Sequence, residues 1–208
     1  MTPAILGIDG GCPGGAVQLA PDGSLLWAAF WDETKDGERI VLRVVAEQHA
    51  APHAWVVETH SFLPMASMVG AVLLDQALRL GPVKHADRWL RPSTVIAVEG
   101  VFVGKDKAGA LDLKGTAQAQ VGHLEVRARS RARWLLATVW RGEVLNLPVR
   151  TASKKAKEAS QTRIPKLIPG FEDALAALDL GNATHHVTDA GGVAFCQRLR
   201  MLKQRRVA

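Results

Sequence analysis

Residues 4–11, Ala-Ile-Leu-Gly-Ile-Asp-Gly-Gly, decide the fold: an apolar run closes on a carboxylate, Asp9, and small residues follow it. A short apolar run bounded by turn residues is typical of a buried strand. Residues 17–19 alternate apolar and polar side chains, residues 21–23 are a Pro-Asp-Gly turn signal, and residues 24–31 have the composition of another strand. The opening therefore predicts an antiparallel three-strand meander with Asp9 on its first strand. The alternative is a hairpin with an aspartate in its turn.

A second apolar run ends on a carboxylate at residues 94–100, Thr-Val-Ile-Ala-Val-Glu-Gly, where the acid is Glu99. A buried carboxylate is costly unless it is paired or binds a metal. Two such strands predict a shared divalent cation, because hard cations prefer carboxylate oxygens. Alternatively, Glu99 faces solvent or caps a helix. A rival for the second acid is Glu58, which closes a short expected strand over residues 54–58.

A third candidate region opens the last expected helix, which begins with Thr-His-His-Val-Thr-Asp-Ala at residues 184–190 and continues to about Leu202. Residues three and four apart share a helix face, so either His186 or His185 can stand beside Asp189. A histidine next to a carboxylate can supply a metal ligand or a general base. The alternative is a solvent-exposed histidine pair at a helix start.

The remaining segments are predicted from periodicity and composition. Helices are expected over residues 38–49, 65–80, 110–136 and 171–180, strand and loop over 138–140 and 144–149, and a basic polar segment over 150–166.

Composition limits the class of protein. The 208 residues suit one domain, and 26 Lys and Arg against 20 Asp and Glu give a net charge of +6, which permits a polyanionic partner such as nucleic acid. Cys12 and Cys196 match no metal-binding spacing and indicate a reducing compartment. No signal peptide is recognised, and the apolar run over residues 65–74 is too short to span a membrane. A cytoplasmic protein without membrane contact is expected.

Three passages in this order resemble RNase H-like nucleases, and more closely the RuvC-type Holliday junction resolvases. They are Ile-Leu-Gly-Ile-Asp at residues 5–9, Ile-Ala-Val-Glu-Gly-Val-Phe at 96–102, and His-Val-Thr-Asp-Ala at 186–190. Residues 110–115 are similar to a further family passage. The resemblance implies an α/β, RNase H-like fold with a mixed central sheet, an antiparallel three-strand meander and flanking helices. The chain departs from the family at Gly10, where proline is usual.

The resemblance also implies the domain organisation. Residues 1–208 would form a single RNase H-like nuclease domain. Asp9 and Glu99 are farther apart than in typical members, so an insertion is expected within about residues 32–90. A basic C-terminal tail covers residues 203–208 and is expected to fray.

The implied activity is that of a crossover junction endodeoxyribonuclease, which resolves four-way DNA junctions by paired symmetric hydrolysis to 5′-phosphate and 3′-hydroxyl ends. Two Mg²⁺ or Mn²⁺ ions per active site are implied. Asp9 would bridge them, Glu99 would hold one, and Asp189 the other, with His186 as ligand or proton-handling neighbour. The implied assembly is a homodimer on branched DNA, in a bacterial or phage-infected cell. The expected DNA contacts are Lys105, Lys107, Lys154, Lys155 and Phe102.

Other functions fit parts of the same pattern. A nuclease of the same fold with a broader branched-DNA or flap substrate shares every motif. Residues 7–11, Gly-Ile-Asp-Gly-Gly, also resemble the first phosphate loop of actin-like and sugar-kinase-type ATPases. Those enzymes need two related domains and a second glycine-rich loop, which this chain does not show. A catalytically idle DNA-binding module has no chemical need for the acids.

Overall fold

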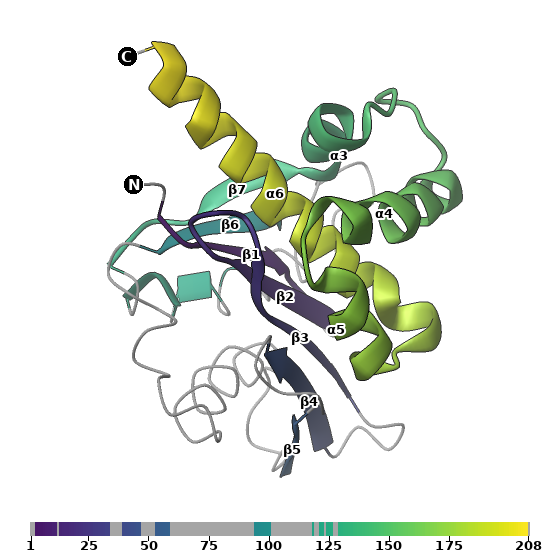
Figure 1. Cartoon of the computed structure of the whole chain (residues 1–208). Helices are drawn as coiled ribbons and strands as arrows, with labels where there is room; N and C mark the ends of the chain where they lie inside the picture. Colours follow the sequence, from purple (N-terminus) through teal and green to yellow (C-terminus); the bar gives the residue numbers. More distant parts are fainter. Residues whose placement is uncertain are drawn as a thin grey trace.

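In the computed structural model, the described residues are 3–11, 13–33, 39–46, 53–58, 94–100, 118, 121–122, 124–126 and 129–207. The strands among them form one sheet in the order β5-β4-β3-β2-β1-β6-β7 (Figure 1). The strands are β1 (Ile5–Asp9), β2 (Gly14–Leu19), β3 (Leu25–Glu33), β4 (Arg39–Ala46), β5 (His53–Glu58), β6 (Val95–Gly100) and β7 (Arg133–Leu136). The helices are α3 (Ala137–Leu145), α4 (Ser153–Leu167), α5 (Phe171–Leu178), a 3-10 turn η2 (Gly181–Ala183) and α6 (Thr184–Val207).

The centre of the sheet has the RNase H-like arrangement predicted from the sequence. Strands β1, β2 and β3 form an antiparallel meander, while β1 pairs with β6, and β6 with β7, in parallel. In the β1–β6 register Ile8 lies opposite Val98, so the next residues, Asp9 and Glu99, reach the same end of two neighbouring strands. Pairing alone therefore brings the first two acids side by side.

Helix α6 lies across one face of the sheet and packs on β1 and β2, with α3 and α4 against it (Figure 1). Its approach to β1 depends on Gly7, where a Cβ would overlap the carbonyl oxygen of Ala190 and lie 2.7 Å from the Ala194 Cβ. At Gly192 a Cβ would overlap the indole of Trp140, which is fully buried on α3. These close approaches place the first half of α6 directly over the acid-bearing strand ends.

The meander is extended at its β3 edge by a hairpin that the sequence did not predict. Residues 38–49 were expected to be helical, and that prediction is wrong, because residues 39–46 form β4 and pair antiparallel with β3. Apolar residues at 40, 41, 44 and 45 fit a helix face, but β-branched side chains are also favoured in strands that pack on a partner. The expected strand over 54–58 is confirmed as β5. The hairpin falls within the expected insertion, and residues 59–93, including the helix expected over 65–80, lie outside the described residues.

The region before α4 also differs from prediction. The helix expected over 110–136 does not reach its predicted end, because Arg129 has a left-handed φ of 49° and residues 133–136 form β7 beside β6. Residues 138–140 and 144–149 were expected to be strand and loop. Residues 137–145 instead form α3, while residues 146–149 are loop as expected. Burial of Trp140 and Leu145 in the core overrides the local strand preference of Thr138 and Val139.

The C-terminal helices follow the sequence prediction. The amphipathic segment expected over residues 171–180 is confirmed as α5 and packs on β3 and β4. Helix α6 is longer than predicted: residues 203–207 continue it, so the expected fraying of the tail is wrong. Among the described residues, no helix combines the length and apolarity that crossing a membrane requires.

Candidate active site

Three carboxylates converge at the carboxyl ends of β1 and β6 under α6. Asp9 comes from β1, Glu99 from β6 and Asp189 from the second turn of α6, where it is only 3% exposed. The parallel register of β1 and β6 places Asp9 beside Glu99. The close packing of α6 on β1 at Gly7 places Asp189 near them. Glu58 instead ends β5, four strands away from β1, or about 19 Å at the usual strand spacing. Of the two rival second acids, Glu99 is the one beside Asp9.

The three acids interact through their charges. Burial, and then the negative charge of Asp189, raise the pKa of Asp9 well above its ordinary value. Burial, followed by the charges of Asp9 and Asp189, raises the pKa of Glu99 to about 8. The positive charge of Arg141 opposes both effects without cancelling them. The cluster therefore lacks positive charge, and this shortage is what an added cation would relieve.

Protein groups already occupy both oxygens of Asp189. The Arg141 guanidinium donates from Nη2 to Oδ2 at 2.7 Å, and the Ser160 hydroxyl donates to Oδ1 at 2.6 Å. The same Arg141 nitrogen lies 3.8 Å from Glu99 Oε1. The second oxygen of Glu99, Oε2, accepts a hydrogen bond of 3.0 Å from Trp140 Nε1.

The two histidines at the start of α6 have different partners, and neither has a hydrogen bond to Asp189. His186 Nδ1 lies 2.7 Å from Asp9 Oδ2. His185 Nε2 lies 3.0 Å from Lys157 Nζ, and its Nδ1 lies 2.9 Å from the Asn182 carbonyl oxygen. Burial lowers the pKa of both rings, and the positive charge of Lys157 adds to this. His186 is thus the histidine of the acid cluster, through Asp9.

The donor set of the cluster fits a hard divalent cation, because it is rich in carboxylate oxygens and poor in sulfur and imidazole. Within the described residues, however, no three His, Cys, Asp or Glu side chains are arranged as a ready metal-binding group. Arg141 Nη2 lies 2.7 Å from Asp189 Oδ2, and His186 Nδ1 lies 2.7 Å from Asp9 Oδ2. The chemistry of the site suits Mg²⁺ or Mn²⁺, while Asp189 is paired with Arg141 and Asp9 lies against the His186 ring.

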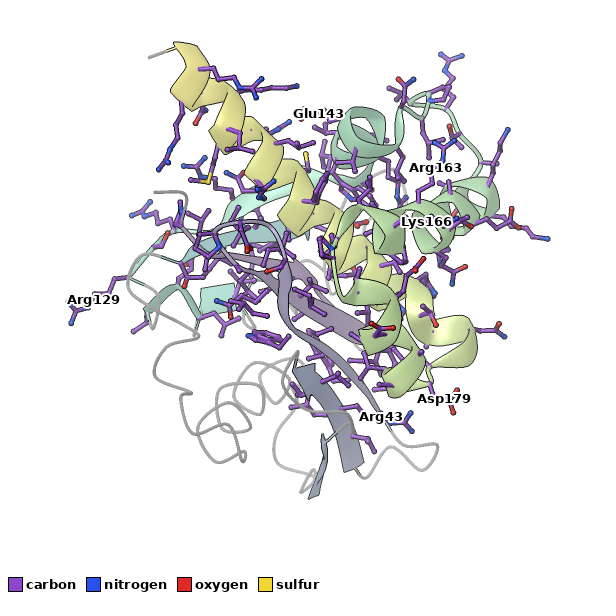
Figure 2. All side chains as sticks on the ribbon, viewed as in Figure 1. Arg43, Arg129, Glu143, Arg163, Lys166 and Asp179 are labelled. Atoms are coloured by element: carbon purple, nitrogen blue, oxygen red, sulfur yellow. The ribbon has the colours of Figure 1, made fainter. Side chains whose placement is uncertain are left out.

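The expected DNA contacts are only partly described. Lys154 and Lys155 lie exposed on the first turn of α4, and Figure 2 shows Arg163 and Lys166 farther along the same helix. Lys105, Lys107 and Phe102 lie outside the described residues. Lys157, which the sequence analysis did not single out as a site residue, is half-buried, and its charge acts on both Asp9 and His186.

Three other residues at the site were missed from the sequence: Arg141, Trp140 and Ser160. The first two lie on α3, where Trp140 ends the predicted strand-and-loop stretch 138–140 and Arg141 follows it. Ser160 lies on α4 about one and a half turns beyond the exposed lysines. No motif marks them. A correct helix prediction over 137–145 would have put Trp140 and Arg141 on adjacent positions of one helix but would not have shown what they contact.

Comparison with known proteins gives structural similarity only. No protein-family model matches the chain, and no curated protein matches its sequence. Among solved structures, the chain is similar to RuvC of Thermus thermophilus, with 14% sequence identity, 96% of each chain covered and a TM-score of 0.46. It is similar to the same extent to T. thermophilus RuvC in complex with a Holliday junction substrate, with 15% identity, 96% of each chain covered and a TM-score of 0.46.

Proposed function

We propose that this protein is a divalent-metal-dependent DNA endonuclease that cleaves four-way junctions. The observation that supports the proposal best is the convergence of Asp9, Glu99 and Asp189 from β1, β6 and α6 of an RNase H-like sheet. The negative charge of Asp189 raises the pKa values of Asp9 and Glu99, and carboxylates crowded together in a largely buried site are unfavourable unless cations join them. The basic surface of α4 beside them supplies a place for phosphates.

Asp9, Glu99 and Asp189 would hold two Mg²⁺ or Mn²⁺ ions, with His186 as a further ligand or as a proton-handling group on Asp9. Bound ions supply activation of a water and stabilisation of the leaving oxygen in phosphodiester hydrolysis. Ser160 orients Asp189 through its Oδ1, and Lys157 holds a positive charge near Asp9. Lys154 and Lys155 are free to contact the DNA backbone, which positions the substrate without reading its sequence.

The finer points of the proposal follow from the resemblance to the resolvases. Symmetric cutting of two strands needs two active sites, so the active form is a two-fold homodimer. The products carry 5′-phosphate and 3′-hydroxyl ends. The protein acts in the cytoplasm of a bacterium or of a phage-infected cell.

The test is cleavage of a synthetic four-way junction, with duplex and flap DNA beside it, in Mg²⁺, in Mn²⁺ and in EDTA. Paired symmetric nicks in the junction alone, dependent on metal, are expected. Asp9→Asn should abolish the nicks and keep junction binding. The matched control is Asp179→Asn, an exposed position with φ of 47° where asparagine is well tolerated.

The other outcomes discriminate between functions. Equal cutting of flaps and junctions would replace the proposal with a broader branched-DNA nuclease. Absence of metal-dependent cutting of any DNA would refute it, and ATP hydrolysis without DNA would point to the ATPase class.

A further inference from the structure

Among the described residues, the guanidinium of Arg141 is the positively charged group that contacts the acid cluster. Its side chain is 17% exposed, and it donates to Asp189 Oδ2 at 2.7 Å while lying 3.8 Å from Glu99 Oε1. It also lies 5.1 Å from the centroid of the Trp140 ring. One side chain from α3 thus ties the acid of α6 to the acid of β6.

The pairing of Arg141 is incomplete. The buried Nε of Arg141 has no hydrogen-bond partner among the described residues. An unsatisfied buried donor is unfavourable, and so is an ion pair taken out of water unless its geometry satisfies every donor. Arg141 is therefore held at the cluster mainly by its attraction to the carboxylates, which leaves it open to replacement by a stronger cation.

The oxygens of Asp189 leave little room for a second cation. Ser160 occupies Oδ1 and Arg141 occupies Oδ2. A metal ion bound to Oδ2 would stand within a few ångströms of the guanidinium, where two positive charges repel strongly because the site is buried. A metal can bind Asp189 with full strength only if the guanidinium moves away.

We propose that Arg141 competes with the metal: in the metal-free protein it offsets part of the negative charge of the acid cluster, and it is displaced from Asp189 when a divalent cation binds. The inference rests on the proposed metal site and adds a residue that sets its affinity. In the metal-free protein Arg141 reduces the repulsion among the acids, and the cost of breaking the Arg141–Asp189 pair weakens metal binding.

The test measures Mg²⁺ and Mn²⁺ binding to the full chain by calorimetry, without DNA. Arg141→Gln removes the competing charge, so its Kd is expected to be at least tenfold lower than that of wild type. Without metal, the melting temperature of Arg141→Gln should be lower than that of wild type. Addition of metal should raise the melting temperature of Arg141→Gln by more than it raises that of wild type. Arg141→Lys keeps a positive charge and should bind metal with intermediate affinity.

Arg200→Gln is the matched control, because Arg200 also donates to a carboxylate, Glu143, but on the surface away from the site. Its metal affinity should equal that of wild type. If Arg141→Gln does not fold, the ¹⁵N resonance of Arg141 Nε in wild type gives a second readout. That resonance should shift during a Mg²⁺ titration with the Kd found by calorimetry.

The outcomes separate this inference from the proposed function. If wild type binds metal, Asp9→Asn loses that binding, and Arg141→Gln binds no more tightly than wild type, the competitor role is wrong and the metal site stands. An Arg141 resonance unmoved at saturating Mg²⁺ leads to the same conclusion. If wild type shows no metal binding that depends on Asp9, both proposals are refuted.

Discussion

The charge repulsion within the acid cluster should make the metal-free protein more stable when Glu99 loses its ability to ionise. Glu99→Gln keeps the size of the side chain and an oxygen that can accept the hydrogen bond of Trp140 Nε1. Arg141 keeps its closer partner, Asp189. The substitution therefore removes a charge and little else.

The magnitude follows from the pKa of Glu99, which rises from 4.5 to about 8 on folding. A raised pKa means that the folded state favours the proton, so the associated stability is complete below pH 4.5 and is lost as the pH rises through about 8. At about 1.4 kcal/mol for each pKa unit, the full loss is about 5 kcal/mol. Movement of the neighbouring charges will make the actual loss smaller than this. We expect the free energy of unfolding of Glu99→Gln to exceed that of wild type by at least about 2 kcal/mol at pH 8 and by little at pH 4.5.

The assay is urea unfolding in EDTA at several pH values from 4.5 to 8.5. The matched control is Glu143→Gln, since the hydrogen bond from Arg200 lowers the pKa of Glu143 and gives the opposite sign. That variant should be slightly less stable than wild type near neutral pH. Equal stability of Glu99→Gln and wild type at pH 8 would show that Glu99 is not held among uncompensated charges, and the electrostatic account of the site would fail.

Three further predictions concern metal, packing and the support of Asp189. Adding Mg²⁺ at 100 times its Kd should raise the free energy of unfolding of wild type by about 2.7 kcal/mol at pH 8. The gain should be smaller at pH 5, because protons compete with the metal for the carboxylates, and chelation should reverse it. A stabilisation that does not depend on pH would contradict the proposed metal site. Gly7→Ala should cost at least about 2 kcal/mol in urea unfolding, because its Cβ would overlap the Ala190 carbonyl, whereas Gly122→Ala, with nothing within 4 Å, should be neutral or stabilising. Ser160→Ala leaves a buried oxygen of Asp189 without its donor and should cost about 1 to 3 kcal/mol, and an unchanged unfolding midpoint would show that the hydrogen bond is dispensable.

The parts of the fold that the sequence predicted are those set by local pattern. Asp9 and Glu99 each end a short apolar run, and such runs pair at the centre of a sheet, so the meander and both strand ends were predictable. The 3.6-residue repeat of α6 predicted a histidine beside Asp189, whereas His186 contacts Asp9 and His185 contacts Lys157. Periodicity could not decide residues 39–46, whose apolar positions fit a helix face, because pairing with β3 determines their structure.

The cations of the site could not be predicted, for a physical reason. Arg141 reaches Asp189 because Trp140 packs against Gly192, a contact between residues 52 apart along the chain. Lys157 acts on Asp9 only because α4 lies against α6. Both arise from helix packing, and one sequence does not encode packing partners in any local pattern. The sequence could not show whether His185 or His186 belongs to the acid cluster for the same reason. The distinction depends on the contact of His186 with Asp9, a residue on β1.

The acid cluster joins the two ends of the described chain: Asp9 and its partner His186 are 177 residues apart. A ribosome adds about 5 to 20 residues per second, so about 9 to 35 s pass between the synthesis of Asp9 and that of His186 at the start of α6. During that interval the nascent chain carries the first acid and the meander without the helix that covers them. An unfinished polypeptide therefore cannot assemble the cluster, and the proposed cleavage of DNA would be confined to molecules whose translation has passed α6.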